Sequence, residues 1–552
     1  MNKKAKKIVK RSIQFLVMVA GIILLLAAYL FLSPALYKIP APLDPATVQD
    51  KIAGTEDLSK NSWIQQNEYG LWEMYLKGAP FERGYLAGKR SQELIQKQEE
   101  AFVAEIKRMI PSEGYIKFLR NFIAIFNRKL DKNIPQEYQE EIYGVSLAAS
   151  DAFDFIGPSY QRMLNYHAAH DIGHALQNMN LVACSVFGTW DAYSEDSSLI
   201  IGRNFDFHVG DEFSEEKTIQ FMEPADGYRF VMITWGGMMG VVSGMNEAGL
   251  SITLNAAKSD IPTKAATPVS IIAREMLQYA DDIASADSIA RIRESFVAES
   301  FYIGSAKDGK AAVIEKKPKQ QALFQTSEDY LVSTNHFQTP DLKHKQYEGA
   351  ARDDYATLYR YQRMEELIDS LAPFNAAKTA ALLRDQKGLD GKNIGMGNEK
   401  AVNQLIAHHS IIFQPDSLRF WVSTKPYQLG TYLCYNLMDA FQEQPPKPLY
   451  RLEKRIPADR FVQSEKYKDF KTYRELKKKI INSESLLDEI QINNFIQLNP
   501  KFYDTYRVAG DHYAKFGKSK LALRHYEKAL EHEIANLWES ASINEKIKQL
   551  QD

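Results

Sequence analysis

The sequence is poor in cysteine and carries almost no net charge. Its 552 residues include only Cys184 and Cys434, which form no C-x-x-C pair. That scarcity excludes a disulfide framework and the usual cysteine motifs for zinc, redox and haem chemistry. The 68 basic and 70 acidic residues leave a formal charge of −2, so no nucleic-acid partner is expected. Any cysteine with a special role would act alone.

The composition also excludes two broad classes of protein. Apolar residues make up 45% of the chain and charged residues 25%, which fits neither a disordered chain nor a polytopic membrane protein. At about 150 residues per domain, the length allows three or four domains. We therefore expect globular units with substantial cores.

A long uncharged run stands near the start of the chain. Residues 1–12 are basic, residues 13–32 carry no charge, and only Lys38 follows closely. Twenty residues rising about 1.5 Å each span about 30 Å, the thickness of the hydrocarbon core. The charge asymmetry predicts a single-pass anchor in the inner membrane, with the rest of the chain on the periplasmic or extracellular side. A cleaved signal peptide is the alternative, because small residues occupy 33–35, but the run exceeds the usual apolar region of such peptides.

The composition and the spacing of apolar residues change several times after this anchor. Residues 33–57, rich in Pro and Ala at their start, indicate a stalk, and 58–183 read mostly as a helical leader. From 182 onward short β-rich runs alternate with turns, interrupted by a helical stretch at 268–293. This order predicts an α+β domain over 184–440, with antiparallel sheets covered by helices.

Cys184 lies at the start of the first predicted hairpin. The strand 182–189 is followed by a polar turn and a return strand that ends in Gly-Arg-Asn-Phe-Asp-Phe. The hairpin would bring Arg203 and Asp206 back beside Cys184. A lone cysteine in an apolar strand is more often a small buried hydrophobe than a nucleophile, and an Arg and Asp at a strand end often form an ordinary ion pair.

Three further motifs strengthen the catalytic alternative. Gly-Met-Asn-Glu-Ala-Gly-Leu leads a strand that ends at Asn255, and Ser-Thr-Asn-His contains Asn335. Arg360 follows in a helical segment, where a solvated charge is the plain alternative. Each asparagine could also simply cap a turn, since strand ends favour that residue.

With these motifs in this order, the sequence resembles the cysteine N-terminal-nucleophile (Ntn) hydrolases. It is most similar to the branch of acyl-coenzyme A:6-aminopenicillanic acid acyltransferase, with the choloylglycine hydrolases as more distant relatives. The resemblance covers roughly residues 81–424, including Glu-Arg-Gly-Tyr at 82–85 in the leader. It implies an αββα sandwich and a precursor that cuts its own chain between Ala183 and Cys184.

The resemblance also implies roles for the site residues. Cys184 would supply both the nucleophilic thiol and, after cleavage, an α-amino group as the base. Asp206 would hold that amine, and Arg203 would favour the thiolate or orient Asp206. Asn255 matches an oxyanion-hole donor and Asn335 a second positioning amide.

Histidines raise the question of a metal. His167, His170 and His174 would line one face of a helix, a spacing that can build a zinc site. They precede the expected cleavage point and lack a neighbouring general base, so packing histidines are the better interpretation. His408 and His409 are likewise interpreted as structural. We predict no metal and no cofactor.

The C-terminal region differs in character. Residues 441–485 are predicted to be a basic linker. Residues 486–552 resemble one tetratricopeptide unit, which would pack on neighbouring helices or bind a protein partner. Its matching positions are Tyr506, Ala509, Gly510, Tyr513, Gly517, Ala522, Tyr526 and Ala529.

Three functions remain open at this stage. The first is a membrane-anchored amidase or acyltransferase that acts on a small acyl compound through a Cys184 thioester. The second is a lipid hydrolase of the phospholipase-B-like kind. The third is a scaffold that recruits partners through the tetratricopeptide-like end, for which Cys184→Ala would leave the biological activity untouched.

Overall fold

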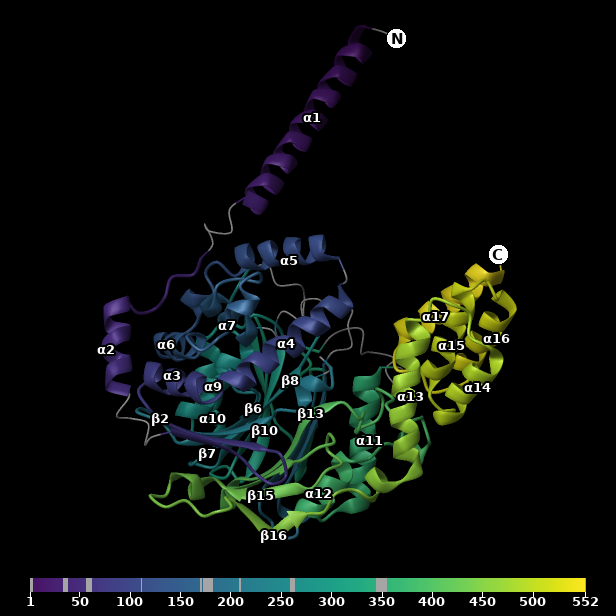
Figure 1. Ribbon diagram of the computed structural model, residues 1–552. Helices are drawn as coiled ribbons and strands as arrows, with labels where there is room; N and C mark the ends of the chain where they lie inside the picture. Colours follow the sequence, from purple (N-terminus) through teal and green to yellow (C-terminus); the bar gives the residue numbers. More distant parts are fainter. Residues whose placement is uncertain are drawn as a thin grey trace.

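A computed structural model describes most of the chain (Figure 1). The described residues are 3–32, 38–55, 62–110, 112–168, 171, 182–207, 210–258, 264–343 and 355–551. Two β-sheets form the centre, helices flank them, and the C-terminal helices gather to one side (Figure 1).

The larger sheet has nine strands. In spatial order these are β1 (Ser62–Gln66), β2 (Trp72–Gly78), β5 (Thr218–Pro224), β6 (Phe230–Thr234), β7 (Ser243–Asn246), β8 (Leu250–Ala256), β9 (Glu299–Ser305), β10 (Lys310–Lys317) and β11 (Gln320–Phe324). All pairs in it are antiparallel except β2 with β5, which are parallel.

The second sheet has seven strands, all paired antiparallel. In spatial order they are β12 (Tyr330–Ser333), β3 (Val182–Thr189), β4 (Ile200–Phe207), β13 (Ala407–Gln414), β14 (Arg419–Ser423), β15 (Tyr432–Asn436) and β16 (Tyr450–Ile456).

Three apolar layers hold these elements together. A central core of residues from both sheets, such as Val186 and Phe221, packs one sheet on the other. A second core joins the nine-stranded sheet to α3 (Pro80–Arg90), α6 (Gln136–Ser146), α9 (Val269–Tyr279) and α10 (Ile283–Ile292). A third joins the seven-stranded sheet to α11 (Ala356–Leu371) and α12 (Ala376–Leu383). The order is helix, sheet, sheet, helix, which confirms the predicted α+β sandwich.

Further helices accompany these layers, and two of them also add side chains to the second core, namely Ile95, Met163 and Leu164. These further helices are α1 (Lys3–Leu32), α2 (Pro45–Thr55), α4 (Gln92–Met109), α5 (Glu113–Phe126), α7 (Ser159–His167), α13 (Glu465–Ile481), α14 (Glu489–Leu498), α15 (Tyr503–Lys515), α16 (Ser519–Leu530) and α17 (Leu537–Gln551).

The leader was predicted to be mostly helical, and it also contains two strands that the sequence did not predict. Residues 58–183 contribute β1 and β2 as well as α3 to α7. The seven residues of β2 pair in parallel with β5, which follows Cys184 in the chain. The two strands were not predicted because they depend on pairing with a distant segment, which the local spacing of apolar residues does not reveal. The leader is therefore built into the larger sheet.

The segment 441–485 is not a simple linker either. Its β16 pairs with β15 and completes the edge of the smaller sheet, and α13 packs on the C-terminal helices through Tyr467, Phe470 and Tyr473. Apolar side chains between the basic ones supply this packing. Helices α15 and α16 pack through Gly510, where an added Cβ would lie 2.6 Å from the Tyr526 ring. Assignment of this region to the tetratricopeptide class stays a prediction.

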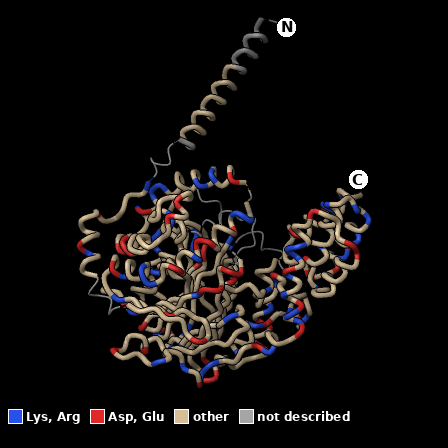
Figure 2. The backbone as a smooth tube through the Cα atoms, viewed as in Figure 1, with Lys and Arg blue, Asp and Glu red and all other residues tan. Residues whose placement is uncertain are grey.

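Helix α1 extends away from the body (Figure 1). Its described side chains carry no charge, whereas acidic and basic residues are interspersed along the rest of the described backbone (Figure 2). Among the side chains described, no helix has the combined length and apolar character of a membrane span. The predicted span 13–32 is described only in part, because the side chains of residues 13 and 30–32 lie outside the description. The anchor stays a prediction.

Candidate active site

The hairpin β3–β4 positions the candidate nucleophile. Cys184 pairs with Phe205, and Ala183 pairs with Asp206. Because side chains alternate along a strand, Cys184 and Arg203 lie on one face of the sheet, and Ala183 and Asp206 on the other. The Ala183–Cys184 bond lies inside a continuous strand that begins at residue 182.

The Cys184 thiol is completely buried and faces a guanidinium group. Nη2 of Arg203 donates to Sγ at 3.6 Å. Burial raises the pKa of the thiol to about 11, and the charge of Arg203 acts in the opposite direction. In the uncut chain the thiol is therefore protonated at neutral pH.

Arg203 is held in place by several acceptors. Nη1 donates to the carbonyl of Val242 at 3.1 Å and to Oγ of Ser243, and Nη2 donates to the carbonyl of Leu254. Oγ of Ser243 lies 2.8 Å from Nε2 of His409, which is itself 3.4 Å from Nη1. These bonds fix the plane of the guanidinium, and hence its approach to Cys184.

Asn335 joins the backbone of Cys184 to Arg360. Its Oδ1 accepts from the Cys184 nitrogen at 2.9 Å and from Nη2 of Arg360 at 2.7 Å. Its Nδ2 donates to the carbonyl of Ala256 at 2.9 Å. Arg360 also donates through Nη1 to the carbonyl of Glu399 at 2.7 Å. The structure thus brings Asn335 and Arg360 to the nitrogen that cleavage would free.

Asp206 is buried without a hydrogen-bond partner for either carboxylate oxygen among the described residues. Burial raises its pKa to about 7, against the opposing charges of Arg360 and Arg203. The expected direct contact with Arg203 is absent here because the two side chains lie on opposite faces of β4. Asp206 faces the side of the strand that Ala183 occupies.

Asn255 lies at the end of β8, close to the strand that precedes Asn335. Its Nδ2 donates to the carbonyl of Ser333 at 3.2 Å, and its Oδ1 has no partner among the described residues. The amide has a second N–H, so a role as donor to an oxyanion stays a prediction.

The histidines have structural contacts. Nδ1 of His167 lies 2.7 Å from the carbonyl of Met163, and its Nε2 accepts from the Met239 nitrogen at 2.9 Å. His170 and His174 lie outside the described residues. Within the described part of the chain, no cluster of three potential ligands could hold a metal ion. His409 contacts Ser243, which in turn accepts from Arg203. The sequence did not predict this contact, because the three residues are far apart in the chain.

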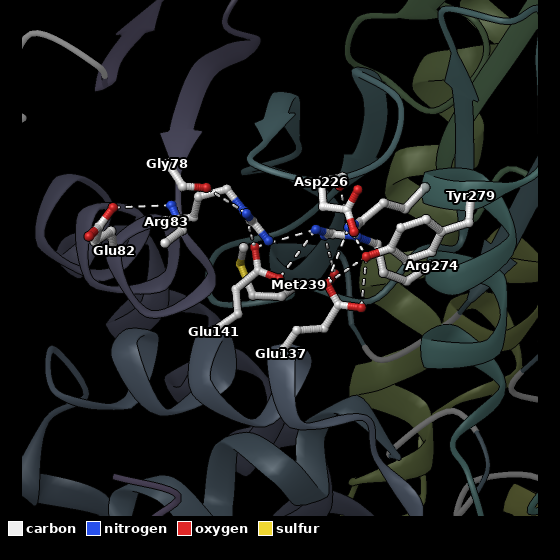
Figure 3. A network of polar contacts seen from close by, with 11 residues as sticks. Gly78, Glu82, Arg83, Glu137, Glu141, Asp226, Met239, Arg274 and Tyr279 are labelled. Atoms are coloured by element: carbon white, nitrogen blue, oxygen red, sulfur yellow. Dashed lines mark hydrogen bonds and ion pairs between the residues drawn. The ribbon is translucent and has the colours of Figure 1, made fainter. Parts of the chain in front are cut away.

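A buried ionic network ties the leader to the rest of the domain (Figure 3). Glu141 of α6 accepts from Nε of Arg83 of α3 at 3.1 Å and from Nη2 of Arg274 of α9 at 3.2 Å. Burial would raise the pKa of Glu141, but the two guanidinium groups outweigh it and the pKa is lowered. Glycine permits the contact: a Cβ on Gly84 would lie 1.8 Å from the Glu141 carbonyl oxygen.

Comparison with known families tests the resemblance. Residues 193–423 match the family model of acyl-coenzyme A:6-aminopenicillanic acid acyl-transferase. The family resemblance is confirmed over this segment. It contains Arg203, Asp206, Asn255, Asn335 and Arg360, while Cys184 lies nine residues before its start. The match covers less than half of the chain and relates this segment to an acyl-transferase family.

Other similarities are more distant. An uncharacterized protein of Archaeoglobus fulgidus is 25% identical in an alignment of 414 positions, which covers 67% of this chain and 66% of that protein's length. A Caenorhabditis elegans ortholog of N-acylethanolamine-hydrolyzing acid amidase is 16% identical, with a TM-score of 0.31 over 42% of this chain and 93% of its own. A variant of conjugated bile acid hydrolase from Clostridium perfringens is 13% identical, with a TM-score of 0.30 over 44% of this chain and 89% of its own.

Proposed function

We propose that this protein is a self-processing, cysteine-type Ntn enzyme that cleaves or transfers the acyl group of a small, non-peptide amide or thioester. Cys184 would form the acyl thioester, and the protein would be held at a membrane by residues 13–32. The match to the acyltransferase family model supports the reaction class. The cysteine mechanism, the substrate and the membrane attachment go beyond this match and are proposed here.

One observation carries the proposal. Both reactive atoms of Cys184 have dedicated partners: Arg203 donates to Sγ at 3.6 Å, and Asn335 accepts from the backbone nitrogen at 2.9 Å. A cysteine that served only as a packing residue would need neither a buried guanidinium nor a buried amide.

In the uncut chain the α-amino group of Cys184 is part of a peptide bond and cannot act as a base, and burial raises the pKa of the thiol to about 11. In self-cleavage, Sγ attacks the Ala183 carbonyl carbon, the peptide bond to Cys184 breaks, and the thiol proton ends on the departing nitrogen. Water then hydrolyses the thioester, releasing the Ala183 carboxylate and restoring the thiol. The new α-amino group, with an ordinary pKa of about 7.7 to 8.0, is a suitable base.

Each residue then has a defined task in turnover. The α-amino group accepts the thiol proton as Sγ attacks the substrate carbonyl, and it returns that proton to the leaving amine or thiol. Arg203 stabilises the thiolate. Asn335 already accepts from the nitrogen, and Asp206, which pairs with Ala183 in the neighbouring strand, would balance the charge of the amine when it is protonated. Water or an acceptor amine finally removes the acyl group.

The experiment is mass spectrometry of the purified full chain. We expect a new N-terminus that reads Cys-Ser-Val-Phe-Gly-Thr-Trp, and no such terminus in Cys184→Ala. Cys434→Ala is the matched control, because Cys434 is also buried but lies in β15 and bonds only to a neighbouring carbonyl. An intact chain with full amidase activity would contradict the proposed base.

Substrate assays separate the alternatives. Release of fatty acid from N-acyl amides, with none from phospholipids, supports the amidase, and the reverse supports a phospholipase-B-like enzyme. A biological activity that survives Cys184→Ala would support the scaffold.

A further inference from the structure

A chain of hydrogen bonds leads from Cys184 toward the C-terminal helices α13 to α17. Asn335 accepts from the Cys184 nitrogen and from Nη2 of Arg360. Nη1 of Arg360 donates to the carbonyl oxygen of Glu399 at 2.7 Å, and Arg360 is buried. The backbone of Glu399 is therefore one of the groups that fix the position of the Arg360 guanidinium.

Glu399 belongs to an irregular segment, residues 394–400, that lies outside the helices and strands. Such a segment depends on side chains to pair its backbone groups. Nδ2 of Asn398 donates to the Ile394 carbonyl at 3.0 Å, and Oδ1 of Asn398 accepts from the Lys400 nitrogen at 2.9 Å. The position of the Glu399 carbonyl thus depends on how segment 394–400 is held.

Connections between the C-terminal helices hold this segment in place. Oδ1 of Asn499 accepts from the Met396 nitrogen at 3.0 Å, and Nδ2 of Asn499 donates to the Met396 carbonyl at 2.8 Å. Nδ2 of Asn398 also donates to the carbonyl of Glu533 at 2.9 Å, and Nζ of Lys400 pairs with Oε1 of Glu533 at 2.8 Å. These bonds tie the segment to the α14–α15 connection and to the α16–α17 connection.

Close packing brings the same regions together. Gly395 has a φ of 86°, and a Cβ there would lie 2.5 Å from the backbone nitrogen of Phe502, just before α15. The nitrogen of Ala356, the first residue of α11, donates to Oδ1 of Asn536 at 3.5 Å. The helix that carries Arg360 therefore also contacts the C-terminal region, which lies beside α11 in Figure 1.

We propose that the C-terminal helices hold Arg360 in the position from which it orients Asn335 and the Cys184 nitrogen. The part of this inference that concerns the reaction at Cys184 rests on the proposed function. Closely packed, hydrogen-bonded segments transmit a displacement from one to the next. Loss of the contacts to segment 394–400 would move the carbonyl that Arg360 bonds, and the guanidinium would follow. The C-terminal region is then part of the catalytic unit and not a separate appendage.

The first test measures self-cleavage in full-length variants of Asn398 and Asn499, the two positioning residues. In Asn398→Ala and in Asn499→Ala we expect the rate constant to fall roughly fivefold, because a displacement of about 1 Å at a reacting group can cost about a hundredfold. Time-resolved mass spectrometry after refolding separates this rate constant from the final yield, which reports the fraction of chains that fold.

His512→Ala is the matched control. Nε2 of the buried His512 accepts from the Leu487 nitrogen at 3.0 Å, a contact within the C-terminal region. This variant should lower stability and leave the rate constant unchanged. An equal fall of the rate constant in His512→Ala would reflect a general loss of folding and would overturn the positioning role.

Unfolding in denaturant tests the contact to Arg360 without any reaction. On the Cys184→Ala background, Asn398→Ala should shift the midpoint less when Arg360 is already replaced by alanine, because the part of the effect that passes through Arg360 is then absent. His512→Ala should shift the midpoint equally in both cases, since its contact is elsewhere. Asn499→Ala takes the place of Asn398→Ala if the latter does not fold.

The outcomes separate the two proposals. Equal midpoint shifts with and without Arg360, or an unchanged rate constant in both asparagine variants, would overturn the positioning role even if the chain cleaves itself. A smaller shift without Arg360, in a protein that neither cleaves itself nor hydrolyses amides, would support the contact with the C-terminal helices and reject the enzyme.

Discussion

The side-chain oxygen of Asn335 accepts a hydrogen bond from the backbone nitrogen of Cys184, 151 residues earlier in the chain, at 2.9 Å. The same oxygen accepts from Arg360 at 2.7 Å. The nitrogen that the proposed cleavage would free is thus bound to a neutral amide, and a buried arginine holds that amide in turn.

We predict that Asn335→Ala slows self-cleavage and lowers amidase activity by at least tenfold, because the Cys184 nitrogen and Arg360 both lose their acceptor. Time-resolved mass spectrometry after refolding measures the first effect. Asn375→Ala is the control: Asn375 caps α12 by accepting from the Lys378 nitrogen, so its loss should cost about 1 kcal/mol of stability and leave cleavage unchanged. Equal cleavage rates in both variants would contradict a role for Asn335.

Arg203→Lys should reduce processing although the charge is kept. An ammonium group cannot reach the thiol while also bonding the acceptors at Val242 and Leu254, as the planar guanidinium does. Ser243→Ala, which removes one of the contacts that hold Arg203, should give a smaller loss of the same kind. The measurement is the yield of the new terminus after a fixed time, with a melting curve for each variant.

Asp206 should make stability depend on pH. Its carboxyl has a raised pKa of about 7 in the folded chain, against 3.8 ordinarily, so the folded state favours the neutral form. The contribution of Asp206 to stability is therefore fully present below about pH 4 and is lost as the pH rises through about 7. On the Cys184→Ala background, Asp206→Asn should remove this loss and raise stability at pH 8 by up to about 4 kcal/mol.

Denaturant unfolding at pH 5 and pH 8 checks the dependence on Asp206. The advantage of Asp206→Asn should be larger at pH 8, whereas a constant difference between the two proteins would argue against a titrating Asp206.

The leader should separate from the processed enzyme when its ionic contact is weakened. Glu141→Gln leaves Arg83 and Arg274 buried beside a neutral group, a change that typically costs 3 to 5 kcal/mol. Size-exclusion chromatography should find the two fragments together in the wild type and partly apart in the variant. Glu247→Gln breaks the half-exposed pair with Arg229 and should cost at most about 1 kcal/mol.

Deletion of residues 1–32 should release the protein from the membrane fraction. The prediction rests on the uncharged run and the basic residues before it. Fractionation of cells that express either form measures it, and amidase activity should be unaffected by the deletion. Equal distribution of the two forms would reject the anchor.

Local patterns were enough to predict the parts of the fold that depend on local residues. The strand at 182–189 was predicted with the bounds of β3, and its partner within a few residues of β4. The helical stretch 268–293 is instead two helices, because Asp282 caps α10 by accepting from the Ser285 nitrogen. The strands β1 and β2 were missed because their pairing with β5 depends on residues far away in the chain.

In the candidate site, too, features carried by local motifs were predicted and features that depend on distant residues were not. Motif order was enough to single out Arg203, Asn335 and Arg360, which the structure brings to Cys184 directly or through Asn335. The support of Arg203 by Ser243 and His409 could not be predicted, because these residues lie 40 and 206 residues away from it in the chain.

The parallel pairing of β2 with β5 sets an order of events for biosynthesis. The ribosome must deliver residues on both sides of the Ala183–Cys184 bond before this pairing can form. If the chain is cut, the pairing of β2 with β5 has to form before the cut. Two fragments expressed separately would have to find each other by diffusion to form the same pairing, whereas in one polypeptide the connecting chain keeps the two strands together.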